Sequence, residues 1–84
     1  MRFEQLRQFI AVAQKGNFRK ASKELGISQP ALTRSIQSLE HYFNAPLFDR
    51  LSTGVTLTDY GMTVLEWAQN AITNTDNKIG RAHV

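Results

Sequence analysis

The 84 residues suffice for one domain with a single core, because a chain of this length buries only about 60–65% of the surface it exposes when unfolded. The 42% of hydrophobic residues gives no reason to expect disorder, and the absence of cysteine excludes disulfides, thiol nucleophiles and cysteine-based zinc sites. The net charge of +3 identifies no partner by itself, and without an apolar run of about 20 residues or a secretory start we expect a cytoplasmic protein with no contact to membranes.

The first two predicted elements are helices that each end at a glycine. Apolar residues at three- and four-residue spacing predict an amphipathic helix over residues 3 to 15, which ends at Gly16. Asn17 is a good N-cap residue for a short second helix over residues 18 to 25, and Gly26 ends that helix.

A third helix is predicted over residues 29 to 43. Ser28 can cap it. The first turn tolerates Pro30, because the N–H groups of a first turn have no hydrogen-bond acceptor within the helix and a residue without an N–H loses no bond there. Asn44, which tolerates the left-handed conformation, stands where the helix should end. Two helices joined by a turn that contains Gly26 indicate a helix-turn-helix.

The third helix has an apolar face and a polar face. At about 100° per residue, four apolar residues fall within about 40° of arc and should be buried. They are Leu32, Ile36, Leu39 and Phe43. The other side carries Pro30, Thr33, Arg34, Gln37 and His41.

The polar face suits contact with DNA. Arg34 can bond guanine O6 and N7, Gln29 and Gln37 can bond adenine, and Thr33 can contact a phosphate or a thymine methyl. Residues 15 to 34 carry five basic residues and one acid, so this segment has a charge of +4 and the remainder −1. The alternative is an ordinary solvated face, but such faces are usually filled with Glu and Lys, which are absent from this one.

A two-stranded hairpin, or wing, is predicted next. Residues 47 to 50 and 55 to 57 are strand-like, and the turn over residues 51 to 54 contains a glycine. Asp49 and Arg50 either pair with each other at the surface or leave Arg50 free to contact a phosphate, and we favour the phosphate.

A final helix is predicted over residues 58 to 79, with Thr58 as its N-cap. It has two adjacent apolar stripes. A heptad seam runs through Gly61, Leu65, Ala68, Ile72, Thr75 and Ile79, and a second stripe through Tyr60, Val64, Trp67 and Ala71. One stripe should pack on the helix-turn-helix and the other on a second copy of the chain, unless both pack into one core. The sequence does not assign the stripes, but we expect a homodimer or higher homo-oligomer with its seam at Leu65, Ala68 and Ile72.

Several motifs resemble the amino-terminal DNA-binding domain of LysR-type transcriptional regulators. Residues 18 to 36 read FRKASKELGISQPALTRSI, and the resemblance continues in Leu39-Glu40, Leu47-Phe48-Asp49-Arg50 and Leu57-Thr58-Asp59-Tyr60-Gly61. It covers about residues 3 to 72. The resemblance implies a mainly α fold, a winged helix-turn-helix of three helices and a two-stranded wing, followed by a long linker and dimerisation helix.

The resemblance also implies a function and a division of the chain. We expect sequence-specific binding to double-stranded DNA, with the helix over residues 29 to 43 in the major groove and a dimer on an interrupted inverted repeat. Expected base contacts are Gln29, Pro30, Thr33, Arg34 and Gln37. Expected backbone contacts are Arg19, Lys20, Ser28, Ser38 and Arg50. The expected parts are a winged helix-turn-helix over 1–57, a dimerisation helix over 58–79 and, over 80–84, a tail or the start of a connection.

The chain departs from the family pattern in two respects. Residues 51 to 56 contain no Arg or Lys, so the wing should contact the DNA backbone rather than the minor groove. Family members usually continue into an effector-binding domain, so we expect a fragment or a truncated gene, on which a small-molecule effector acts only through that absent domain.

Two other classes of function are less well supported. An enzyme could draw on Ser28, His41 and Asp49, but capping, helix exposure and the hairpin explain them, and no phosphate loop or metal-ligand spacing accompanies them. We therefore expect no catalytic residue, cofactor or metal. A winged helix used only for protein pairing is the better alternative, but the polar face lacks the apolar anchor that protein docking needs. Duplex binding at low and moderate salt distinguishes these classes.

Overall fold

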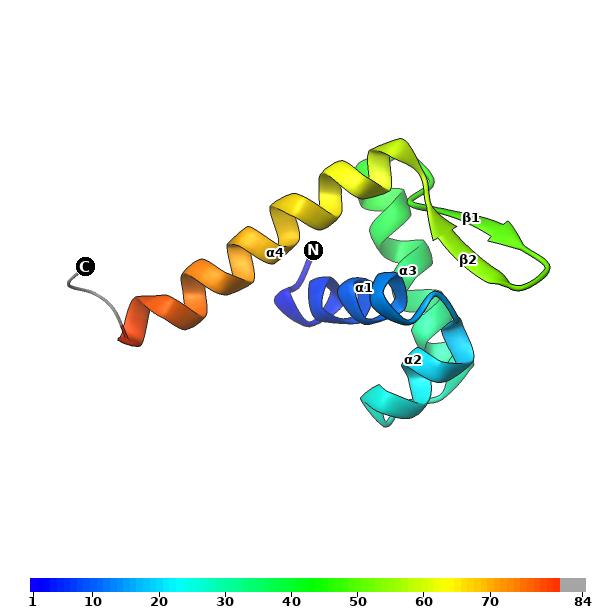
Figure 1. Cartoon of the computed structure of the whole chain (residues 1–84), viewed down its shortest axis with the longest axis horizontal. Helices are drawn as coiled ribbons and strands as arrows, with labels where there is room; N and C mark the ends of the chain where they lie inside the picture. The colour runs from blue at the N-terminus through cyan, green and yellow to red at the C-terminus, as the bar shows by residue number, and fades with distance from the viewer. Residues whose placement is uncertain (81–84) are drawn as a thin grey trace.

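The computed structural model describes the backbone of residues 1–80 and the side chains of residues 1–73. Three short helices, a hairpin and a long helix follow one another along the chain (Figure 1). They are α1 (Phe3–Lys15), α2 (Phe18–Leu25), α3 (Gln29–Phe43), β1 (Phe48–Leu51), β2 (Gly54–Leu57) and α4 (Asp59–Gly80). The predicted fold class, a winged helix-turn-helix followed by a long helix, is confirmed.

Local capping sets the limits of the first three helices, which are those predicted. The Asn17 side chain accepts a hydrogen bond from the Lys20 amide at 2.9 Å, and the Ser28 hydroxyl accepts one from the Ala31 amide at 3.2 Å. Asn44 ends α3 in the left-handed conformation, with φ 56°. These caps bond backbone groups that the helix ends leave without partners.

One core lies between α1, α2, α3, the hairpin and the first half of α4. Its largest fully buried side chains are Phe9, Val12, Leu32, Leu39 and Leu47. The predicted apolar face of α3 is confirmed, with Ile36 also buried and Phe43 partly buried against the core. Because this face packs inward, the other side of α3 is left at the surface.

The hairpin begins one residue later than predicted. Phe48 pairs with Leu57 and Leu51 with Gly54, so Ser52 and Thr53 alone form the turn. Leu47, where the first strand was predicted to start, lies directly before β1, and its amide donates to the side chain of α3 residue Glu40.

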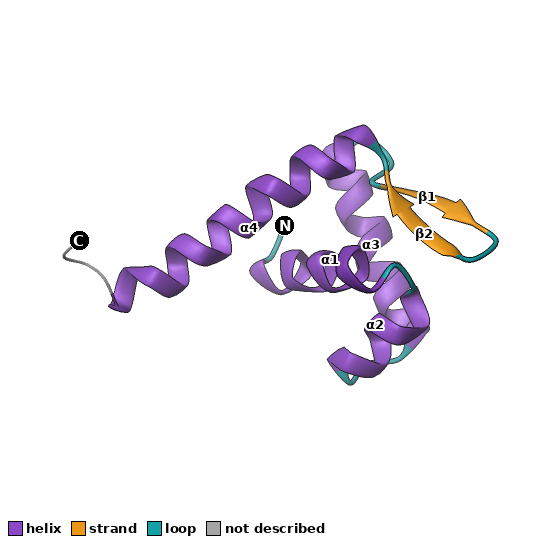
Figure 2. Ribbon diagram, viewed as in Figure 1, coloured by secondary structure: helices purple, strands orange, loops and turns teal. Residues whose placement is uncertain are grey.

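The hairpin lies against the turn between α1 and α2. The amide of Val55 donates to the carbonyl oxygen of Gly16 at 3.0 Å. A Cβ on Gly54 would lie 2.2 Å from the same oxygen, so only a residue without a side chain allows this approach. Figure 2 shows the strands projecting on the opposite side of the molecule from the far end of α4.

The last helix starts at Asp59 with Thr58 as its cap, since the Thr58 hydroxyl accepts a hydrogen bond from the Gly61 amide at 2.9 Å. Within the residues that the structure describes, no helix has the length and apolar character needed to cross a membrane. Gly80 belongs to α4, and the rest of the predicted tail lies outside the described residues.

The two stripes predicted on α4 do not separate into a core face and a partner face. Ala68, which was assigned to the dimer seam, has no exposed surface and packs within its own chain. Leu65 and Ile72 are partly buried against the same core, and Val64 from the other stripe is itself a buried core residue. The core-facing side of α4 therefore lies between the two stripes, and the dimer seam at Leu65, Ala68 and Ile72 stays a prediction. Thr75 and Ile79 lie outside the described side chains.

Candidate nucleic-acid interface

The first half of α3 exposes the residues that were predicted to contact bases. Gln29, Pro30 and Arg34 are exposed and Thr33 is half-buried, and these four side chains line one shallow hollow. Gln37 is exposed one turn further along the helix. The polar face of the sequence pattern is therefore a real surface of the folded chain.

Two further hollows join this surface to α2 and the wing. A groove between the start of α2 and the hairpin is lined by Arg19, Gln29 and Arg50, among others. A narrower notch at the base of the wing is lined by Thr33, Gln37 and Arg50, among others. Because the three hollows share Gln29, Thr33 and Arg50, they form one continuous surface, here called the α3–wing surface.

Three of the predicted backbone contacts lie less centrally. Lys20 and Ser28 are exposed next to residues of the α3–wing surface, and the Ser28 hydroxyl also caps α3. Ser38 is exposed on α3 but lines none of the three hollows. The structure therefore does not bring Ser38 together with the other candidates.

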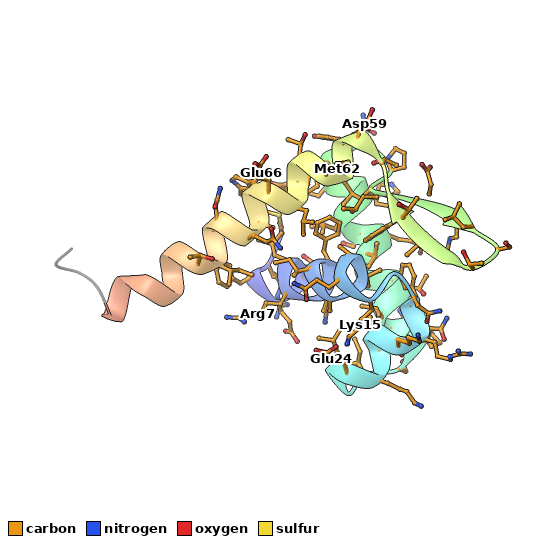
Figure 3. All side chains as sticks on the ribbon, viewed as in Figure 1. Arg7, Lys15, Glu24, Asp59, Met62 and Glu66 are labelled. Carbon is orange, nitrogen blue, oxygen red and sulfur yellow. The ribbon has the colours of Figure 1, made fainter. Side chains whose placement is uncertain are left out.

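The charges near this surface favour an anionic partner. The Lys15 ammonium lies 3.0 Å from the Glu24 carboxylate, and Figure 3 shows these side chains pointing toward each other. This exposed pair contributes little to stability, but it neutralises the one acid between residues 15 and 34. Neither α2 nor α3 has an acidic residue in its first turn, so the partial positive charge of each helix start remains open to a phosphate.

Glu40 positions the wing, a role that the sequence did not suggest. Its carboxylate accepts hydrogen bonds from the amides of Leu47 at 2.7 Å and Phe48 at 3.4 Å. These bonds join the end of α3 to the first strand. The available signal was its position four residues after the buried stripe residue Ile36, where a partly buried acid needs a hydrogen-bond partner.

Arg50 lies over an aromatic ring rather than beside a carboxylate. Its guanidinium carbon is 5.1 Å from the centroid of the Phe18 ring. Among the described side chains no ion pair joins Asp49 to Arg50, so the surface pair considered from the sequence is not formed. Arg50 remains exposed at the base of the wing.

Aromatic side chains gather where α3 ends and α4 begins. The Phe43 ring lies 5.1 Å from Tyr42, 6.0 Å from Tyr60 and 6.4 Å from Trp67, measured between centroids. Tyr42, Tyr60 and Trp67 are 61%, 42% and 47% exposed. Such a half-exposed group is typical of a protein contact rather than a nucleic-acid contact. Among the described residues, no cluster of three His, Asp or Glu side chains could hold a metal ion.

Comparisons with known proteins agree on one family. The family described as "Bacterial regulatory helix-turn-helix protein, lysR family" matches residues 3–62. The chain is 50% identical over 72 residues to the HTH-type transcriptional regulator ClcR of Pseudomonas putida, covering 86% of this chain and 24% of that protein. It is 42% identical over 84 residues to TfdS of Cupriavidus pinatubonensis, covering 100% of this chain and 27% of that protein. The chain thus spans about a quarter of the length of these relatives.

Solved structures resemble the fold over nearly the whole chain. The CbnR_DBD–DNA complex matches with a TM-score of 0.90 and 39% identity, covering 98% of this chain and 94% of that chain. The complex of BenM_DBD with catB site 1 DNA matches with a TM-score of 0.90 and 34% identity, covering 98% of this chain and 92% of that chain. Both of these similar domains were solved with DNA.

Proposed function

This chain belongs to the lysR family of bacterial regulatory helix-turn-helix proteins, and we propose that it is the DNA-binding domain of a LysR-type transcriptional regulator. It binds a specific double-stranded sequence in the bacterial cytoplasm, with α3 in the major groove, and it is not an enzyme. The observation that carries the proposal is the α3–wing surface, where the exposed side chains Gln29, Pro30 and Arg34 adjoin cations and two helix starts without acids.

The proposed contacts divide into two kinds, because base contacts give specificity while phosphate contacts fix the position of the protein. The base contacts are Gln29, Pro30, Thr33, Arg34 and Gln37. The phosphate contacts are Arg19, Lys20, Ser28, Ser38 and Arg50, of which Ser38 has the weakest structural support. The winged helix-turn-helix over residues 1–57 thus carries every proposed DNA contact, and residues 58–79 carry the pairing helix.

Arg34→Ala tests the base contact. If the guanidinium bonds guanine O6 and N7, its loss should weaken binding to the preferred site by about 1–3 kcal/mol and relax base preference at one position. Binding to a scrambled duplex should fall much less. Titration against both duplexes measures the difference, with Arg7→Ala on α1 as the matched control for loss of one arginine. An equal loss on both duplexes with unchanged base preference would make Arg34 a backbone contact.

Arg50→Ala tests the phosphate contact. Its removal should weaken binding to preferred and scrambled duplexes by similar factors and lower the slope of log affinity against log salt by about one unit. The control is Asp49→Ala, which removes the neighbouring exposed side chain but no positive charge. An unchanged salt slope in the Arg50 variant would contradict the assignment.

We also propose that the chain forms a homodimer through α4, with the exposed aromatic group at its centre. Trp67 and Tyr60 present apolar surface that the chain's own core does not cover. The partly buried Leu65 and Ile72 lie on the other side of the buried Ala68 and also leave apolar surface exposed. Two copies related by a two-fold axis present two α3 helices to one face of DNA, so the preferred site is an interrupted inverted repeat. A small-molecule effector acts only through parts of the regulator outside this chain.

Trp67→Ser should shift the chain from dimer to monomer at micromolar concentration, because it removes the largest exposed apolar side chain of α4. Sedimentation equilibrium measures the shift. Leu51→Ser is the matched control, since Leu51 is 54% exposed but lies on the wing. A wild-type chain that is monomeric at several hundred micromolar would end the dimer proposal.

A further inference from the structure

Arg50 is the one basic residue of the hairpin, residues 48 to 57. A wing with several cations can contact phosphates in many orientations, whereas this wing depends on one guanidinium. An exposed arginine usually samples many rotamers, and fixing them on binding costs conformational entropy. How Arg50 is oriented before binding therefore bears directly on the affinity for DNA.

The ring beneath Arg50 is fixed by the core. Phe18 is 7% exposed, and its ring lies 6.0 Å from that of Phe48 at an interplanar angle of 71°. Phe48 in turn lies 5.3 Å from Phe9, which has no exposed surface. Phe18 thus belongs to a continuous run of packed rings that reaches the surface under the Arg50 guanidinium.

The backbone of both partners is fixed as well. Arg50 pairs across the hairpin with Val55, whose amide donates to the Gly16 carbonyl oxygen at 3.0 Å. Gly16 lies two residues before Phe18, which is the first residue of α2. The strand that carries the guanidinium and the helix that carries the ring are therefore joined next to the contact itself.

We infer that Phe18 is a positioning residue, whose ring orients the Arg50 guanidinium by a cation–π contact so that it faces a DNA phosphate in the groove between α2 and the wing. The inference rests on the proposed DNA-binding function. The same groove contains Arg19 and the start of α2, which attract the same phosphate. Orienting Arg50 in advance reduces the entropy lost on binding, and the cation–π contact leaves the N–H groups at the edge of the guanidinium available.

The first test uses the free 84-residue chain. The side-chain protons of Arg50 should resonate upfield of those of Arg34, because they lie above an aromatic ring and the described side chains place no ring under Arg34. Phe18→Leu should abolish that displacement while circular dichroism reports a folded domain. The absence of an upfield shift in the wild-type chain would overturn the inference, whether or not the Phe18 variant folds.

The second test is a double-mutant cycle in DNA binding. Phe18→Leu should weaken duplex binding by about two- to fivefold when Arg50 is present, and not at all in the Arg50→Ala background. A ring with a merely structural role would weaken both backgrounds equally. Phe9→Leu is the control, since it removes a core ring that does not underlie Arg50.

The outcomes separate the two proposals. A wild-type chain that binds no duplex would refute the proposed function, even with the upfield shift intact. The function would stand and the positioning role would be overturned by a different result. In that result Arg50→Ala lowers the salt slope, but Phe18→Leu weakens binding equally with and without Arg50. The expected result is an upfield shift, an Arg50-dependent slope and a Phe18 effect confined to the Arg50 background.

Discussion

Leu39→Ala is expected to lower the free energy of unfolding by about 2–5 kcal/mol, a large effect for a domain of this size. Leu39 has no exposed surface and lies at the centre of the α3 stripe. The substitution loses the transfer free energy of the buried side chain and leaves a cavity, because α1, α3 and α4 cannot all close around the smaller residue. Urea denaturation followed by circular dichroism measures the change.

The matched control for this prediction is Leu51→Ala. Leu51 is 54% exposed on β1, so removal of the same atoms should change the free energy of unfolding by less than about 0.5 kcal/mol. A loss below half a kcal/mol for Leu39→Ala would mean that the α3 stripe does not form the core. Because Leu39 lies opposite the polar face, the folded fraction of the variant should still bind duplex DNA.

Gly61→Ala is expected to destabilise the domain by about 3 kcal/mol, at the upper end for an overpacked site. In a solvated helix the same change would stabilise by about 1 kcal/mol, because alanine is the better helix former. Here a Cβ would lie 2.2 Å from the Leu47 carbonyl oxygen and 3.1 Å from a Leu57 methyl carbon. The oxygen belongs to the backbone and cannot rotate away, so α4 must shift and steric repulsion outweighs helix propensity.

Asn70→Ala is the control for the stability gained from the higher helix propensity of alanine, since Asn70 is exposed on the same helix. It should stabilise the domain slightly, by a few tenths of a kcal/mol. Thermal unfolding of both variants gives the comparison. If Gly61→Ala instead raised the melting temperature, the close packing of α4 against the Leu47 carbonyl would be contradicted.

Elements set by local interactions could be predicted from the sequence. The limits of α1, α2 and α3 follow from Gly16, Asn17, Gly26, Ser28 and Asn44, each of which acts on a backbone group within a few residues. The buried face of α3 could also be predicted, because the three- and four-residue spacing of its apolar side chains is a local pattern. The candidate DNA-binding face was identified as the remainder of that helix, so its exposure could be predicted along with the core.

Interactions between distant parts of the chain could not be predicted. The rotation of α4 depends on how its buried side packs against α1 and β2, which the period of α4 alone does not determine. The hydrogen bonds of Glu40 to Leu47 and Phe48, and the contact of Arg50 with Phe18, join residues up to 32 positions apart. Each requires a three-dimensional arrangement that no local pattern encodes.

The separation of the two faces of α3 has a consequence for how such a regulator can change its target during evolution. The side chains at 29, 30, 34 and 37 are exposed, whereas the packing of the helix rests on Leu32, Ile36 and Leu39. Under the proposed function, substitutions at the exposed positions are expected to alter which operator is recognised at little cost in folding. A library randomised at positions 29, 34 and 37 should retain mostly folded members, from which selection could recover domains for new operators.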